Sequence, residues 1–127
     1  MTATISSPTE HLARELGSEQ VLSTRPIDRI KYAHDASHFL YTPDVVVEAR
    51  NAHDVAAAFR ASAASGAPVV LRAGGTSLSG QASGRGMLVD VRKHFRGVEV
   101  LDGGARVRVQ PGSTVRQVNA CLLYTSP

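Results

Sequence analysis

The stretch Val69-Val-Leu-Arg-Ala-Gly-Gly-Thr-Ser-Leu-Ser-Gly-Gln81 joins a short apolar run to a loop rich in glycine and hydroxyl side chains. The β-branched run over 69–72 predicts a strand, and the loop that follows has glycines at positions 74, 75 and 80. Glycine permits positive φ and lets a ligand approach the backbone closely. Successive amides in such a turn can converge on an anion, and Arg72 adds positive charge beside them. This chemistry suits a phosphate or a pyrophosphate.

Three familiar glycine motifs do not account for this loop. From Gly75 the P-loop spacing reaches Gly80, but Gln81 stands where a P-loop needs lysine. A dinucleotide-binding turn needs a helix directly afterwards, whereas here the sequence runs into the apolar segment Met87–Val91. Ser79 stands where a nucleophile elbow needs a glycine. On motif physics alone, an anion site and a flexible surface loop remain equally open.

The sequence before the loop predicts a strand followed by a helix. The run Val45–Ala49 is β-branched and predicts a buried strand. Asn51 can cap a helix, with Asp54 three residues later as a shortened capping box, and Gly66 can end that helix. Strand, helix and strand in about thirty residues form a βαβ unit with parallel strands and a right-handed crossover. Helical spacing indicates that the helix buries Ala52, Val55, Phe59 and Ala63.

The sequence after the loop changes to an alternating pattern. Met87–Val91 predicts a third strand, and valines alternate with polar residues over 97–101 and 105–110. The turn Asp102–Gly104 would join these last two segments as an antiparallel hairpin. Because a parallel unit then lies beside an antiparallel ladder, the predicted class is α+β.

The sequence also predicts a helix before the first of these strands, and a turn followed by a helix after the last one. Thr9 would cap a short helix over Glu10–Leu16, which Gly17 would end. Pro111 and Gly112 suit the central positions of a type II turn. Ser113 or Thr114 would then open a last helix, with these residues inward: Val115, Val118 and Leu122.

Composition excludes several classes of protein. The 127 residues allow one domain at most, and the net charge of +3 comes from scattered basic residues, which is not a nucleic-acid footprint. The single cysteine, Cys121, excludes an internal disulfide framework. The segment His34-Asp-Ala-Ser-His38 has the spacing of a zinc motif, but no third ligand is evident, so we predict no metal. No leader or spanning segment is visible, so we expect a cytoplasmic protein, with peripheral membrane association left open.

Taken together, these segments resemble the start of an FAD-linked oxidase domain of the vanillyl-alcohol oxidase and p-cresol methylhydroxylase (PCMH) type. The resemblance covers residues 30–120 and rests on these segments: Pro43–Val47, the helix over 52–65, Pro68–Gln81, Leu88–Val91 and Val109–Gly112. Asp35-Ala-Ser37 and the run Gly75–Gln81 are similar to the glycolate oxidase and D-lactate dehydrogenase branch. That branch includes members fused to a C-terminal iron–sulfur module.

The resemblance implies an α+β, PCMH-type fold, an FAD cofactor and a set of residues that bind it. The loop would hold the FAD pyrophosphate, and the flanking segments would line the cofactor elsewhere. Many relatives attach FAD covalently through a histidine at the position of Thr76, so the resemblance implies that FAD is held noncovalently here. The implied cofactor-binding residues are Pro43, Arg72, Gly74, Gly75, Thr76, Ser77, Gly80, Gln81, Pro111 and Gly112.

The resemblance also implies an activity for the parent protein, namely an FAD-dependent dehydrogenase or oxidase of 2-hydroxy acids such as D-lactate or glycolate. The family's catalytic residues lie beyond this sequence, so we name none, and the electron acceptor is left undetermined. We expect an N-terminal segment over 1–29, an incomplete FAD-binding domain over 30–120, and a tail over 121–127 that resembles translated adapter sequence. Two alternatives stay open: an inactive or stand-alone phosphate-binding module, and a flavin oxidase of alcohols or sugars.

Overall fold

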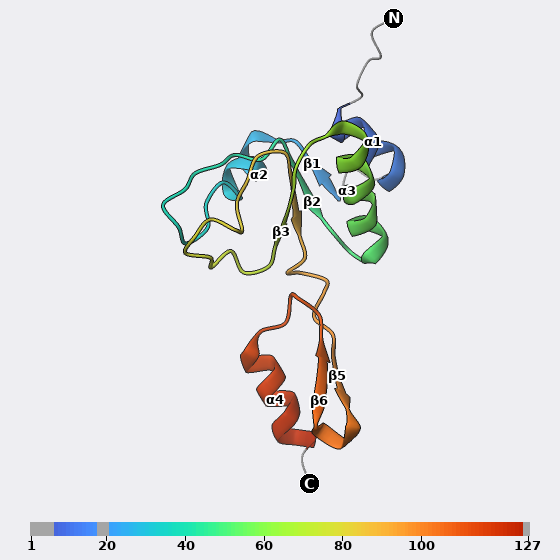
Figure 1. The fold of residues 1–127 in the computed structure, drawn as a ribbon, viewed down its shortest axis with the longest axis vertical. Coiled ribbons are helices and arrows are strands. Elements are labelled where there is room, and N and C mark those ends of the chain that lie inside the picture. The colour runs from blue at the N-terminus through green and yellow to red at the C-terminus, as the bar shows by residue number, and fades with distance from the viewer. Residues whose placement is uncertain (1–6, 18–20, 126–127) are drawn as a thin grey trace, which may run out of the picture.

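A four-stranded sheet forms the centre of the fold in a computed structural model, which describes residues 7–17 and 21–125. The strand order is β1-β2-β4-β3, with β2 and β3 both parallel to β4 and β1 antiparallel to β2 (Figure 1). The predicted parallel βαβ unit is therefore confirmed, with β4 inserted between its two strands. The strands are β1 (Leu22–Ser23), β2 (Val45–Glu48), β3 (Val69–Arg72) and β4 (Met87–Asp90).

Helices and loops cover the two faces of this sheet differently. The helices α1 (Pro8–Leu16) and α3 (Ala52–Ser65) lie together on one side of the sheet. The short helix α2 (Pro26–Lys31) lies on the other side, with the two long loops over 32–44 and 73–86 (Figure 1). The glycine-rich loop thus runs from the carboxyl end of β3 back to the amino end of β4.

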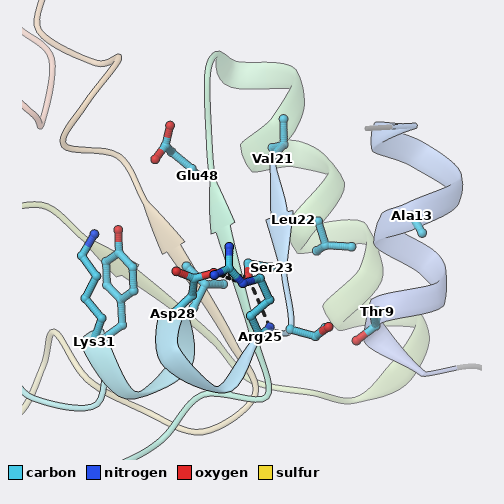
Figure 2. Close-up of a pocket in the computed structure, with 12 residues that line it drawn as sticks. Thr9, Ala13, Val21, Leu22, Ser23, Arg25, Asp28, Lys31 and Glu48 are labelled. Atoms are coloured by element: carbon cyan, nitrogen blue, oxygen red, sulfur yellow. Dashed lines mark hydrogen bonds and ion pairs between the residues drawn. The ribbon is translucent and has the colours of Figure 1, made fainter. Parts of the chain in front are cut away.

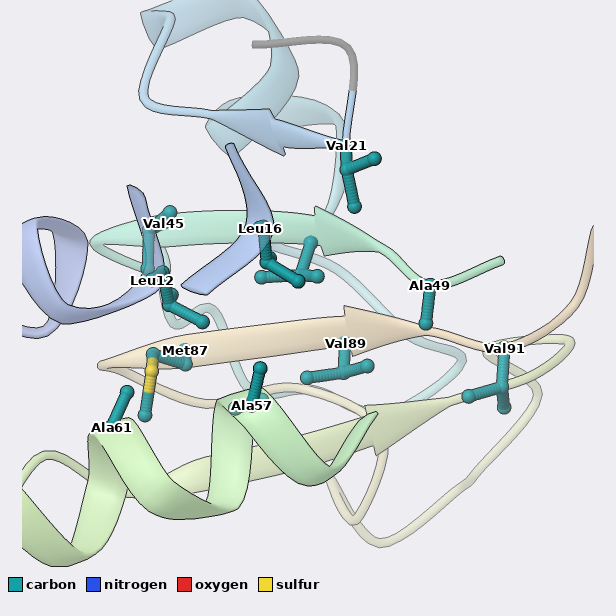
Figure 3. Close-up of a cluster of buried hydrophobic side chains, with 12 residues drawn as sticks. Leu12, Leu16, Val21, Val45, Ala49, Ala57, Ala61, Met87, Val89 and Val91 are labelled. Atoms are coloured by element: carbon teal, nitrogen blue, oxygen red, sulfur yellow. The ribbon is translucent and has the colours of Figure 1, made fainter. Parts of the chain in front are cut away.

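The apolar core lies between the sheet and the pair α1 and α3 (Figure 3). Alternate residues of β2 and β4 face this core, while Val46 and Leu88 point to the opposite face and are also buried. Burial on both faces is typical of the inner strands of a parallel sheet. The main side chains of the core are Leu12, Leu16, Val45, Val47, Ala57, Ala61, Met87 and Val89.

The first helix begins earlier than its sequence pattern predicted. Ser7, and not Thr9, is the N-cap: its hydroxyl accepts the Glu10 N–H at 3.2 Å, and the Glu10 carboxylate accepts the Ser7 N–H at 3.1 Å. This capping box places Pro8 at the first helical position, where its missing N–H costs nothing. Gly17 ends the helix in the left-handed conformation, as predicted.

The bounds of α3 are as predicted, but its predicted inward face is largely wrong: Val55 packs against the core, whereas Ala52, Phe59 and Ala63 are exposed. Phe59 is 52% exposed, and the buried residues are Asp54, Ala57, Ala58 and Ala61. Small alanine side chains allow α3 to approach both the sheet and α1 closely, so the helix turns its alanine stripe inward and its large side chain outward.

The capping box predicted at the start of α3 forms only in part. Asn51 accepts the Asp54 N–H at 3.0 Å, as expected of an N-cap. The Asp54 carboxylate, however, accepts the backbone N–H and the guanidinium Nε of Arg50, both at 2.9 Å. Since Asp54 is only 1% exposed, this pairing is what satisfies its charge inside the structure.

A hairpin and a helix form a separate lobe beyond the sheet (Figure 1). Strands β5 (Val98–Leu101) and β6 (Arg106–Val109) pair antiparallel through the short 3-10 turn η1 (Asp102–Gly104), as the alternation predicted. Helix α4 (Val115–Thr125) contacts β5. This mixture of parallel and antiparallel pairs confirms the α+β class.

Two local predictions in and next to this lobe are wrong. Val115, at the start of α4, is 76% exposed, although Val118 and Leu122 are partly buried as expected. The turn at Pro111 and Gly112 forms, with Ser113 N–H donating to the Gln110 carbonyl at 3.1 Å. Gly112 does not have a positive φ, however, so the turn is not of type II.

Candidate functional site

The glycine-rich loop presents a row of backbone donors next to the end of β3. Gly75 has φ +67° and Gly80 has φ +83°, a backbone conformation that favours glycine at both positions. Among the described residues, nothing accepts a hydrogen bond from the N–H groups of Gly74, Gly75, Thr76 or Ser77. Four successive amides with no protein partner are the donors that an anion-binding turn requires.

Arg72 lies with its guanidinium beside Gly75, in the middle of the segment that carries these amides. Its Nη1 donates to the carbonyls of Tyr32 at 3.1 Å and Ala82 at 3.4 Å, and its guanidinium lies 5.4 Å from the centre of the Tyr32 ring. A Cβ atom at Gly75 would come within 2.5 Å of the same guanidinium. Glycine at position 75 permits this positive φ, a Cβ there would make the end of the Arg72 side chain shift, and the arginine charge lies beside the loop.

The second half of the loop is closed by hydrogen bonds of its own. The Ser77 hydroxyl accepts the N–H groups of Ser79 and Gln81, both at 3.2 Å, and donates to the Gln81 side-chain oxygen. The predicted binding residues therefore divide into two groups. Gly74 to Ser77 offer unengaged amides, whereas Gly80 and Gln81 shape the turn that presents them.

The remaining predicted residues lie at two different edges of the sheet. Gly112 is at the carboxyl edge: its N–H donates to the Phe95 carbonyl at 2.7 Å, and a Cβ there would meet the carbonyls of Arg92 and Phe95 at 2.6 Å. Pro43 is buried at the amino edge, where its carbonyl accepts Arg29 Nε at 2.6 Å. The structure thus places Gly112 at the edge where the glycine-rich loop begins, with Pro43 at the opposite edge.

Three residues that contact the loop were not predicted as part of the site: Tyr32, Asp35 and Phe39. The Asp35 carboxylate accepts the Ser37 N–H at 2.8 Å and the Ala82 N–H at 3.3 Å. A Cβ at Gly80 would come within 2.7 Å of the Phe39 ring. The sequence Asp-Ala-Ser signals a local turn, but nothing in the sequence indicates that this turn contacts the loop.

Tyr32 and Asp35 both have pKa values that differ from the ordinary ones. The Tyr32 hydroxyl donates to the Asp90 carboxylate at 2.5 Å, and burial followed by this hydrogen bond raises the pKa of Tyr32 far above its ordinary value. Hydrogen bonding from Ser37 holds the pKa of Asp35 below its usual range. Tyr32 therefore stays neutral and Asp35 stays ionised at neutral pH.

A cavity of about 710 Å³ lies away from the loop, since no residue of 73–86 lines it. It opens between α1, β1 and α2 and includes Tyr32 (Figure 2). Its charged lining has both signs, with Arg25 and Lys31 beside Asp28 and Glu48. Mixed charge of this kind does not favour a pyrophosphate.

Over 7–17 and 21–125, no group of three or more histidine, cysteine, aspartate or glutamate side chains is placed to hold a metal ion. None of the helices in this part of the chain combines the length and the apolar character that crossing a membrane requires.

Comparison with known proteins gives consistent matches. Residues 43–124 match the family model described as FAD binding domain. The D-2-hydroxyglutarate dehydrogenase of Escherichia coli (strain K12) is 34% identical over 104 residues, which cover 79% of this chain and 10% of that protein. The enzyme of the same name from Pantoea ananatis (strain AJ13355) matches with the same identity and coverage. The chain therefore spans about a tenth of the length of the curated relatives it matches.

Solved structures show the same fold. A xylooligosaccharide oxidase from Myceliophthora thermophila C1 matches with a TM-score of 0.72 and 21% identity, over 94% of this chain and 25% of the oxidase. A p-cresol methylhydroxylase matches with a TM-score of 0.72 and 16% identity, over 92% of this chain and 24% of that enzyme. With most of its length matched by the family model and its fold shared with these enzymes, the chain belongs to the FAD binding domain family, with a PCMH-type fold.

Proposed function

We propose that residues 72–77 hold the pyrophosphate of FAD without a covalent bond. The observation that carries this proposal is the run of four amides, Gly74 to Ser77, that no described residue engages and that lies against the Arg72 guanidinium. Residues 72–84 contain no aspartate or glutamate to repel a pyrophosphate. Asp35 reaches the loop at Ala82, but its carboxylate already accepts two backbone N–H groups.

Two of the other predicted binding residues fit an extended cofactor: FAD is long, so Pro111 and Gly112 at the carboxyl edge of the sheet can line a further part of it. Pro43 lies at the amino edge with its side chain fully buried and its carbonyl bonded to Arg29, which does not support a direct contact with the cofactor. Thr76 offers a hydroxyl and no imidazole at the position of the covalent attachment, which supports noncovalent binding. We include residues 30–120 in this FAD-binding unit.

We further propose that the protein containing this chain is an FAD-dependent oxidoreductase of 2-hydroxy acids. A bound flavin supplies hydride-transfer chemistry, and the protein supplies binding and orientation. Support comes from the two curated relatives, both named D-2-hydroxyglutarate dehydrogenase, at 34% identity. The residues described above serve the cofactor, and we assign no catalytic residue among them.

A sugar oxidase is the second candidate. The xylooligosaccharide oxidase and a glucose dehydrogenase both match the fold with a TM-score of 0.72. Their identities, 21% and 18%, support a common fold and do not extend to substrate. The sequence similarity to the hydroxy-acid dehydrogenases therefore makes that class the better supported one.

One experiment separates these proposals. The natural genomic reading frame that contains this sequence is expressed, desalted and examined for flavin absorbance, before and after acid precipitation. We expect a yellow protein that releases its flavin into the acid supernatant. Under anaerobic conditions D-2-hydroxyglutarate, D-lactate or glycolate should bleach the flavin, and glucose or xylobiose should not. A colourless protein would contradict FAD binding, flavin retained in the pellet would contradict noncovalent attachment, and bleaching by sugars alone would favour the second candidate.

A further inference from the structure

The segment Tyr32–Phe39, which we call the strap, contacts the glycine-rich loop at two points and the Arg72 side chain at the end of β3 at a third. The Tyr32 carbonyl accepts Arg72 Nη1 at 3.1 Å, next to the first half of the loop. The Asp35 carboxylate accepts the Ala82 N–H at 3.3 Å, at the far end. The Phe39 ring lies against Gly80 between them, so closely that a Cβ at Gly80 would come within 2.7 Å of the ring.

The strap is itself held in shape by Asp35 and Ser37. The Asp35 carboxylate accepts the Ser37 N–H at 2.8 Å, and the Ser37 hydroxyl accepts the Phe39 N–H at 3.2 Å. This chain of side-chain to backbone hydrogen bonds fixes a local turn. One carboxylate therefore anchors the strap internally through one oxygen and holds the loop through the other.

The loop needs such external support. Its donor half, Gly74 to Ser77, makes no hydrogen bond to any described residue through its N–H groups, so within that part of the structure nothing on the amides themselves fixes their direction. Gly75 and Gly80 would give the loop backbone additional freedom if Arg72 and Phe39 did not pack against them. A loop that is ordered before its ligand arrives binds more tightly, because less conformational entropy is lost on binding.

We propose that the strap positions the glycine-rich loop for pyrophosphate binding and that Asp35 is its principal positioning residue. The inference rests on the proposed function, because it assumes that the loop holds the FAD pyrophosphate. Asp35 acts through the backbone of Ala82 and through Phe39 on Gly80, and it does not contact the cofactor. Removal of the Asp35 carboxylate should therefore weaken binding of the pyrophosphate part of FAD and of no other part. Charge repulsion alone predicts the opposite result, because a carboxylate near a pyrophosphate weakens its binding.

The test compares two flavins in the natural protein after its flavin has been removed. FAD carries the pyrophosphate and riboflavin does not, and flavin fluorescence gives a dissociation constant for each. Asp35→Ala should weaken FAD binding about tenfold or more, the scale of a lost hydrogen bond to a charged group, and leave riboflavin binding within about twofold. Asp35→Asn keeps one acceptor oxygen and should recover part of the loss, and if Asp35→Ala does not fold this variant carries the test.

Asp28→Ala is the matched control. Asp28 is a partly buried aspartate on α2 that accepts the Ser23 hydroxyl at 2.6 Å, close in sequence to the strap, and none of its described hydrogen bonds or ion pairs is with the loop. Its substitution should leave the FAD and riboflavin constants unchanged.

The possible outcomes separate the two levels of the proposal. FAD affinity unchanged in folded Asp35 variants would overturn the role of the strap while leaving the proposed function in place. An equal loss for FAD and riboflavin, accompanied by a lower melting temperature, would show a merely structural role and would also overturn it. If the unsubstituted protein bound neither flavin, the proposed function itself would fail.

Discussion

The two faces of the central sheet are held by different kinds of interaction. The face toward α1 and α3 is apolar, with Leu12, Met87 and Val89 fully buried. The face toward α2 and the two long loops buries Val46 and Leu88 but also carries polar contacts, among them Tyr32 to Asp90 and Arg72 to Tyr32. The first arrangement stabilises the fold by removing apolar surface from water, and the second gives direction to backbone groups. We infer that stability and cofactor binding can be changed separately by substitutions on the two faces.

Leu12→Ala tests the apolar face and should have the largest effect. Leu12 is fully buried between α1 and the sheet, so its truncation leaves a cavity in the core. We expect the free energy of unfolding to fall by about 2–5 kcal/mol. Denaturant unfolding measures the change. FAD affinity of the folded variant should remain within about twofold, and a large loss of affinity at unchanged stability would contradict the separation of the two faces.

Gly75→Ala tests the loop face and should have the next largest effect. The substitution places a Cβ at a φ of +67° and within 2.5 Å of the Arg72 guanidinium. The cost of about 1–3 kcal/mol should appear mainly as FAD affinity reduced about tenfold or more, measured by flavin fluorescence.

Gly66→Ala is the control for that variant. Gly66 also has a positive φ, +73°, but a Cβ there would meet nothing within 4 Å. This variant should lose about 1 kcal/mol of stability and no FAD affinity. Equal losses of affinity in the two glycine variants would refute a specific role for the loop.

Ser7→Ala removes the capping box of α1 and should have a smaller effect. The Ser7 hydroxyl and the Glu10 carboxylate each satisfy one backbone N–H at the start of the helix. Their loss should reduce the free energy of unfolding by about 1 kcal/mol, as measured by thermal or denaturant unfolding. Thr9→Ala should change little, because Thr9 is inside the helix, and the reverse order of effects would restore Thr9 as the cap.

The smallest expected effect is on the pH dependence of stability and concerns the buried Asp54 of α3. Hydrogen bonding from Arg50 holds the pKa of Asp54 below its usual range. The folded protein therefore binds a proton at Asp54 less tightly than the unfolded chain does. The contribution of the Asp54 carboxylate to stability is complete above the unfolded pKa of about 3.9 and is lost as the pH falls through the folded pKa. Asp54→Asn should flatten the acid limb of a plot of melting temperature against pH. Asp44→Asn, at an exposed ion pair of 4.0 Å, should leave that limb unchanged.

The sequence predicted the apolar face better than the polar one, and the reason is physical. Runs such as Val45–Ala49 and Val69–Arg72, and the stops at Gly17 and Gly66, carry local signals of strand and helix boundaries. The face of α3 was wrong because periodicity gave weight to the large Phe59, whereas close packing selected the alanines.

The candidate site was predictable only where its chemistry is local. The glycines and hydroxyls of 74–80 are adjacent in sequence, so their backbone conformation could be inferred. The contacts of Tyr32, Asp35 and Phe39 with this loop join segments about forty residues apart, and they depend on how β4 inserts between β2 and β3. Neither composition nor spacing contains that information, and the position of Pro43 at the opposite edge follows from the same topology.

The central claim is that the amides of Gly74 to Ser77 bind the pyrophosphate, and hydrogen exchange measured by mass spectrometry tests it most directly. The natural protein, freed of flavin, is compared with and without saturating ADP, and with adenosine as the ligand that lacks the pyrophosphate. We predict slower exchange in peptides covering 72–82 with ADP and no change there with adenosine. Protection by ADP confined to peptides around the cavity between α1, β1 and α2, with none over 72–82, would contradict the account.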